Sequence, residues 1–135
     1  MALQFSTNAR NGMLDAIETE LGASPFLAIW TGAAPANCAA ANSGTELARM
    51  TLPADAMAAA SSASKAKSGT WEDPTGNAAG SAGHFRLYKT DGTTCVMQGT
   101  VTATGGGGDM TLDNVSIAVG QQVTISTFTL SIGGA

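Results

Sequence analysis

The feature that most constrains this fold is a pair of alternating segments joined by Asp91-Gly92, within HFRLYKTDGTTCVMQGTVTAT at residues 84–104. In the first segment, Phe85 and Leu87 fall on one face of a strand, and His84, Arg86 and Tyr88 fall on the other. Asp-Gly between two such segments is a strong signal for a tight turn. The sequence therefore predicts an antiparallel hairpin here.

Four other segments read as strands. FLAIWTG, residues 26–32, is a short apolar run that ends at glycine, and TELARMTLP, residues 45–53, places apolar side chains on one face and ends at proline. MTLDNVSI, residues 110–117, alternates, and QQVTISTFTLSIG, residues 121–133, carries apolar residues on both faces, which predicts one central or interfacial strand. Six to eight short strands are typical of a mainly β fold, an antiparallel β-sandwich or jelly-roll-like barrel.

One helix is predicted at residues 6–23, ahead of a β domain at residues 26–135, within a single domain that spans residues 1–135. Ser6 or Thr7 can cap its start, and Gly22 ends it. The apolar positions recur at helical spacing and define one face, which consists of Ala9, Met13, Leu14, Ile17 and Leu21. The acidic residues Asp15, Glu18 and Glu20 fall largely off this face.

Two segments give weaker signals. Residues 33–44 have the composition of a loop. The Ala-rich segment from Ala54 to Gly69 favours a short helical turn or an exposed loop equally, and a strand edge with small residues is a third interpretation.

Charge and composition argue against nucleic-acid and membrane partners. The net charge is −4, and the six Lys and Arg are scattered, so we expect no nucleic-acid partner. No apolar stretch approaches the roughly 20 residues of a membrane span, and no signal-peptide pattern opens the chain, so we expect folding in a cytoplasm and no membrane partner. Cys38 and Cys95 are expected to be ordinary thiols there, with oxidation possible outside the cell. Abundant small residues bury little apolar area each, which favours a homo-oligomer.

The glycine run at residues 105–108 raises the question of a phosphate-binding loop. Such a loop needs a helix after it and usually a lysine. Here a strand-like segment follows and no lysine does. We therefore interpret the run as a mobile or tightly curved connection that could also permit close packing against another subunit.

The remaining chemically capable residues do not form a recognisable catalytic pattern. His84 is the single histidine, so no histidine cluster is available, and nothing local supports its pairing with Cys38 or Cys95. Two carboxylate pairs, Glu72 with Asp73 and Asp109 with Asp113, are interpreted as solvated turns or strand flanks. Three aromatic residues, predicted to be core anchors rather than a sugar-binding platform, are Trp30, Trp71 and Tyr88. We predict no catalytic, cofactor-binding or metal-binding residues and no enzyme activity.

The phrases AGHFRLY, GTTCVMQGTV and GGGGDMTLDN, with WTGAAPANCAAANSGTELARMTLP, resemble small virion structural proteins of tailed bacteriophages. The resemblance covers most of the chain and includes no catalytic motif. It implies a head decoration, or cement, protein that binds the major capsid protein and itself, with a trimer favoured, in a virion assembled in the host cytoplasm. A neck, tail or fibre-base protein is the alternative, and a carbohydrate-binding module is a weaker one. The contact surfaces expected are the helix, the segment from Ala54 to Ser68 and the glycine loop.

Overall fold

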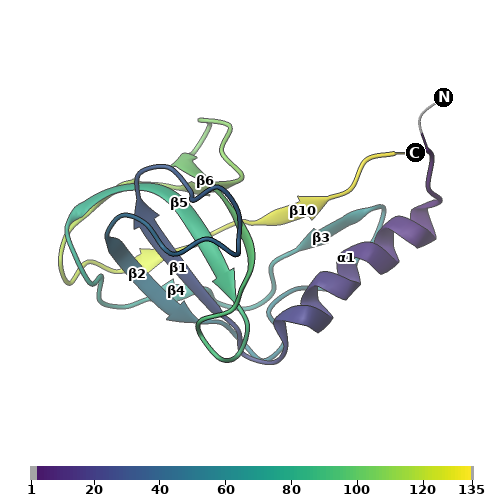
Figure 1. The fold of residues 1–135 in the computed structure, drawn as a ribbon, viewed down its shortest axis with the longest axis horizontal. Helices are drawn as coiled ribbons and strands as arrows, with labels where there is room; N and C mark the ends of the chain where they lie inside the picture. The colour runs from purple at the N-terminus through teal and green to yellow at the C-terminus, as the bar shows by residue number, and fades with distance from the viewer. Residues whose placement is uncertain (1–2, 135) are drawn as a thin grey trace.

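The computed structural model describes residues 3–134, which form a mainly β fold with one N-terminal helix, so the predicted fold class is confirmed (Figure 1). The helix and strands have the following bounds: α1 (Thr7–Leu21), β1 (Phe26–Thr31), β2 (Glu46–Thr51), β3 (Ser64–Ala66), β4 (Glu72–Asp73), β5 (Gly80–Tyr88), β6 (Cys95–Ala103), β7 (Met110–Leu112), β8 (Ser116–Ile117), β9 (Val123–Thr124) and β10 (Thr129–Ser131).

The largest sheet has six strands in the order β2-β1-β5-β6-β7, with β8 also paired to β5. Its pairs are antiparallel except β6 with β7, which is parallel, so the curled sheet is mixed. Apolar side chains fill the core on one face of β1 and β5, among them Leu27, Ile29, Phe85 and Leu87. The other face is also buried, and it carries Ala28, Trp30, His84, Arg86 and Tyr88.

The predicted hairpin is confirmed. β5 pairs antiparallel with β6, and His84 lies opposite Thr100. Gly92 has a φ of +73°, and its N–H donates to the Lys89 carbonyl at 2.8 Å. Because glycine enters this left-handed region without a steric penalty, the Asp-Gly pair closes the turn.

The predicted helix is confirmed as well, with its caps. The Ser6 hydroxyl accepts a hydrogen bond from the Ala9 N–H at 3.1 Å, and Gly22 ends α1 with a φ of +80°. Leu14 and Leu21 are buried, and Leu21 belongs to the main core. Met13, predicted to lie on the packing face, is instead 39% exposed.

The Ala-rich segment is not helical. Its first half, up to residue 60, is largely irregular with several exposed residues, as the loop interpretation predicted, and its second half contains strand β3, as the strand interpretation predicted. Residues 57–67 form a narrow hairpin with bridges between Met57 and Lys67 and between Ser61 and Ser64, and its strand β3 pairs with β10. The two turn residues, Ser62 and Ala63, have φ of +53° and +59°. Such turns normally carry Asn-Gly or Asp-Gly. Ser-Ala therefore gave no turn signal in the sequence.

The single strand expected at residues 121–133 is also corrected. It is two short strands in different sheets, since β9 pairs with β4 and β10 pairs with β3. Val123 and Ile125 are buried, and then Phe128 is, so the buried face changes phase between the two strands. This change is why the sequence showed apolar residues on both faces.

The elements α1, the 57–67 hairpin and β10 extend together to one side of the six-stranded sheet, and we call them the arm (Figure 1). The two ends of the described chain meet at the tip of the arm, where the Phe5 N–H donates to the Gly134 carbonyl at 2.6 Å. The helix thus packs mainly on the hairpin, and only its C-terminal end joins the core of the sheet.

Candidate functional site

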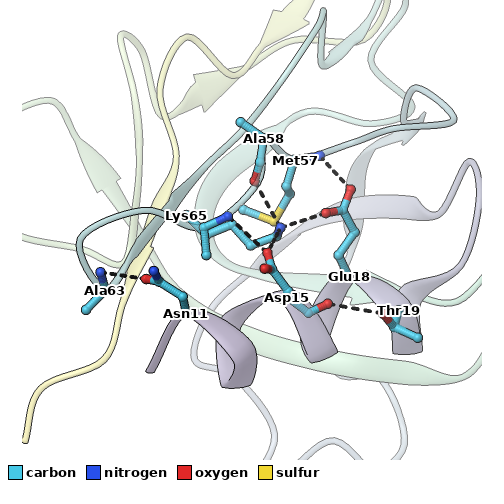
Figure 2. Close-up of polar contacts among 9 residues, drawn as sticks. Asn11, Asp15, Glu18, Thr19, Met57, Ala58, Ala63 and Lys65 are labelled. Carbon is cyan, nitrogen blue, oxygen red and sulfur yellow. Dashed lines mark hydrogen bonds and ion pairs between the residues drawn. The ribbon is translucent and has the colours of Figure 1, made fainter. Parts of the chain in front are cut away.

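Lys65 is the centre of the densest group of charges in the described part of the chain. It is 1% exposed although it is a cation. Its Nζ lies 2.7 Å from Asp15 Oδ1, 2.7 Å from Glu18 Oε2 and 2.9 Å from the Ala58 carbonyl (Figure 2). A buried ammonium is tolerated only when it is paired and hydrogen-bonded, and all three protons of Lys65 have an acceptor here.

The same helix face also binds the backbone of the 57–67 hairpin. Glu18 Oε1 accepts from the Met57 N–H at 3.1 Å, and Asp15 Oδ1 accepts from the Ala60 N–H at 3.0 Å. One turn earlier, Asn11 accepts from the Ala63 N–H at 2.8 Å (Figure 2). Residues 11, 15 and 18 lie on one face of a helix because they are four and three apart.

This arrangement corrects one expectation. Asp15 and Glu18, predicted to lie off the packing face, contact the hairpin together with Asn11. The segment from Ala54 to Ser68 remains a predicted surface for a partner, and three of its backbone N–H groups donate to the chain's own helix. Two of the three predicted contact surfaces therefore cover each other in part.

The pKa shifts in this group follow from its contacts. The hydrogen bonds from Lys65 and from the Ala60 N–H lower the pKa of Asp15. Burial acts to raise the pKa of Glu18, but the bonds from Lys65 and Met57 outweigh it, so the pKa is lowered. The carboxylate of Glu18 in turn raises the pKa of Asp55. Burial opposes the charge of Lys65, yet Asp15 and Glu18 still raise its pKa.

A cavity of about 470 Å³ opens beside this group. It lies between the C-terminal half of α1 and the start of the hairpin, and its polar wall includes Asp15, Glu18, Asp55 and Lys65. Asp15 Oδ1 and both carboxylate oxygens of Glu18 already accept bonds from the chain itself. The group therefore acts chemically as a junction between two elements.

A second polar group covers the far face of β1 and β5. Arg86 is 2% exposed, and its guanidinium donates to Gln98 Oε1 at 3.0 Å and to Asn42 Oδ1. It also donates to three carbonyls of the 33–44 loop, those of Asn37, Cys38 and Ala40. None of the ion pairs among residues 3–134 includes Arg86. Neutral acceptors thus stabilise the buried guanidinium of Arg86, and its hydrogen bonds fix the 33–44 loop against the sheet.

Tyr88 belongs to the same layer. Its hydroxyl donates to Asn42 Oδ1 at 2.9 Å, and burial raises its pKa, an effect that Arg86 partly offsets. Trp71 is fully buried and Trp30 is 8% exposed. The prediction that these three aromatic residues are core anchors is confirmed.

His84 is buried and stacks on Trp30, with ring centroids 6.3 Å apart and planes 9° from parallel. Its Nδ1 lies 2.9 Å from the Gly32 carbonyl, while His84 Nε2 and Trp30 Nε1 have no hydrogen-bond partner among residues 3–134. No hydrogen bond in the described chain links His84 to Cys38 or Cys95, which contact each other instead. The structural role predicted for His84 fits this environment.

The glycine run bends the chain back onto β6. Asp109 Oδ2 accepts from the Thr100 N–H at 2.9 Å and from its hydroxyl at 3.0 Å. The Gly108 N–H donates to Thr102 Oγ1 at 2.9 Å. These bonds bring β7 parallel to β6 after only six residues, whereas parallel neighbours usually need a crossover of a dozen or more.

Side chains would prevent this return. A Cβ on Gly106 or Gly108 would lie 2.8 Å from atoms of Thr102, and Gly105 and Gly107 have φ of +86° and +80°. The connection is therefore tightly curved, as one of the two interpretations predicted. A strand follows it and no helix does, so the geometry lacks the helix N-terminus that a phosphate loop uses.

The two carboxylates of each predicted pair have different surroundings. Asp73 is 6% exposed and accepts from the backbone N–H groups of Arg49 and Thr75, so the prediction of a solvated turn is wrong for it. Glu72 is more exposed than Asp73, and its carboxylate accepts a hydrogen bond from the Gln122 side chain. Asp109 is bound to Thr100 as described, and Asp113 lines a separate cavity of about 210 Å³.

Within residues 3–134, no group of three or more His, Cys, Asp or Glu side chains is placed to hold a metal ion. The helix that the structure describes is neither long nor apolar enough to cross a membrane.

The sequence did not indicate that Lys65 and Arg86 are buried, and both were counted only among six basic residues scattered along the chain. A weak signal was present for Lys65, because three polar residues follow helical spacing along α1. No comparable signal marked Arg86, since its acceptors are mostly backbone carbonyls of a loop.

Comparisons with known proteins give no relative: no family model, no curated protein and no solved structure matches this chain.

Proposed function

We propose that this chain is a structural protein of a tailed-bacteriophage particle, a decoration or cement protein that binds the head lattice and stabilises it. Its partners are the major capsid protein and further copies of itself, with a trimer as the favoured assembly. The protein acts by binding, without catalysis, so it stabilises the lattice by mass action.

The observation that carries the proposal is the arm with its apolar tip. Leu3 is 81% exposed and Phe5 is 39% exposed, and both precede α1 where the two ends of the described chain meet (Figure 1). Apolar side chains at the end of a projecting element are suited to insertion between neighbouring subunits. The phrase resemblance described above supports the same class of protein.

The use of the charged residues adds support. Lys65, Arg86, Asp73 and Asp109 each bind the chain's own backbone or side chains. Such contacts rigidify a small β domain rich in small residues. A rigid shape with an apolar tip favours a binding role over catalysis.

The alternative is a neck, tail or fibre-base protein, which the same arm could serve in a ring. The carbohydrate-binding module is less supported, because a sugar platform needs exposed aromatic faces and Trp30, Trp71 and Tyr88 are buried.

Quantitative mass spectrometry of purified particles tests the proposal through the copy number relative to the major capsid protein. A ratio near one to one supports the cement role. A far lower ratio would indicate that the protein lies at the neck, the tail or a single vertex. Absence of the protein from particles would reject a virion role.

A matched pair of variants tests the arm. Leu3→Asp places a charge at the tip, whereas Val119→Asp changes another exposed apolar residue, 71% exposed, outside the arm. We expect Leu3→Asp to lose incorporation into particles and Val119→Asp to keep it. Equal incorporation of both variants would reject the arm as the contact.

A further inference from the structure

Cys38 and Cys95 are far apart in the sequence and in contact in the fold. The two Sγ atoms lie 2.7 Å apart, and both thiols are free. A disulfide bond is about 2.05 Å long, so a small movement separates this contact from a bond. Both residues are half-buried, and a small reagent can therefore reach them.

The surrounding structure holds both backbones in place. Arg86 donates to the Cys38 carbonyl at 3.4 Å and to the Ala40 carbonyl at 3.0 Å, which fixes the 33–44 loop over the sheet. Cys95 begins β6 and lies opposite Tyr88 on β5. The contact between the two sulfurs thus follows from the buried Arg86 layer.

We propose that Cys38 and Cys95 are a site of reversible oxidation, which forms an intramolecular disulfide when the protein meets a small-molecule disulfide such as oxidised glutathione. One cysteine thiolate attacks the reagent, forms a mixed disulfide and releases one glutathione thiol. The second cysteine then loses its proton and attacks the first cysteine sulfur, which releases the second glutathione. Two electrons pass from the protein thiols to the reagent, and two glutathione thiols are produced.

Burial of the two cysteines makes formation of the disulfide slow. Burial and the neighbouring Cys38 thiol raise the pKa of Cys95 to about 12. The thiolate is the reactive form, and it is scarce for Cys95 at neutral pH. We expect the bond to form over minutes to hours, after folding is complete.

The disulfide would tie the 33–44 loop to the start of β6 and close a long loop, since its two cysteines are 57 positions apart in the sequence. Cross-links over loops of this length restrict the unfolded chain strongly. We expect the Tm of the oxidised protein to exceed that of the reduced protein by roughly 5–15 °C. This inference stands independently of the proposed function, because it concerns the isolated protein.

The experiment incubates purified protein with oxidised glutathione and follows free thiols, intact mass and disulfide-linked peptides. The expected product is a monomer two hydrogens lighter, without free thiols, in which peptides containing Cys38 and Cys95 are joined. Persistent glutathione adducts without the internal bond, or dimers linked between chains, would overturn the proposal. Full retention of both thiols under conditions that oxidise a model dithiol would overturn it as well.

The single variants Cys38→Ser and Cys95→Ser are the controls. Each should stay folded with one thiol, stop at the mixed disulfide and show no gain in Tm on oxidation. If one variant fails to fold, the other together with the peptide map of the wild-type protein still decides between an internal bond and a dead-end adduct.

Discussion

Different interactions stabilise the arm and the six-stranded sheet internally. In the sheet, apolar side chains from β1, β2 and β5 make a continuous core, which includes Leu27, Leu47 and Phe85. In the arm, the contact between α1 and the 57–67 hairpin depends on Lys65 and its carboxylates. Apolar burial scales with area and tolerates rearrangement, whereas a buried charge depends on a few bonds of defined geometry. The comparison predicts that the sheet controls global stability and that the arm can open separately.

The largest effect is expected from Trp71→Ala in the core. Trp71 is fully buried, its Nε1 donates to the Ala56 carbonyl at 3.1 Å, and its ring lies 5.7 Å from that of Phe128. Truncation leaves a cavity and removes one of the two hydrogen bonds that the Ala56 carbonyl accepts, the other coming from the Ser68 N–H, so the free energy of unfolding should fall by about 3–5 kcal/mol. Urea unfolding measures this change. A loss below about 1 kcal/mol would show that the residue is not a core anchor.

A smaller and more local effect is expected from Lys65→Met, which leaves Asp15 and Glu18 without their cation. Breaking a fully buried pair costs about 3–5 kcal/mol, but these carboxylates are partly solvated, so we expect about 2 kcal/mol. Hydrogen exchange should show faster exchange at the Ala60 and Ala63 amides and unchanged protection in β1 and β5.

The matched control is Lys67→Met, on the same hairpin. Lys67 is more exposed, and its Nζ bonds only the Gly69 carbonyl among the described hydrogen bonds. Lys67→Met should lower the free energy of unfolding clearly less than Lys65→Met does. Equal effects, or loss of protection throughout the sheet, would show that the arm and the sheet unfold as one unit.

The smallest effect concerns acid pH. The pKa values of Asp15 and Glu18 are lowered in the folded protein, so their contribution is complete above their ordinary values of 3.8 and 4.5 and is lost as the pH falls below them. The raised pKa of Asp55 partly offsets this loss. Lys65 has a raised pKa, so its contribution is lost only as the pH rises beyond 10.5. We therefore expect the arm to lose protection below about pH 4.

The sheet has its own acid-sensitive group, since hydrogen bonds from Thr94 and Thr93 lower the pKa of Asp91 to about 2. Comparison of wild type with Lys65→Met separates the two regions. The difference in unfolding free energy between the wild type and Lys65→Met should shrink as the pH falls from about 5 to about 2. The pH dependence that Asp91 contributes should be the same in both proteins. A difference that is constant with pH would contradict the role given to Asp15 and Glu18.

Local signals predicted much of the sheet and the helix. The hairpin of β5 and β6 follows from alternation with Asp91-Gly92, and α1 follows from its capping residue Ser6 and terminal Gly22. These features depend on neighbours within a few residues, so a single sequence contains the information. The 57–67 hairpin has no such signal, because its turn uses Ser62 and Ala63 in a left-handed conformation that sequence preferences disfavour.

The sequence by itself determined the mainly β character, the single N-terminal helix and the burial of Trp30, Trp71 and Tyr88. Only the tertiary structure decided that Lys65 and Arg86 are buried, that Cys38 contacts Cys95 and that residues 121–133 divide between two sheets. The physical reason is that a strand or helix pattern records the polarity of each side chain at its own position. The partner that makes a buried charge tolerable, or that places one thiol in contact with another, comes from a distant segment, and its position depends on the whole fold.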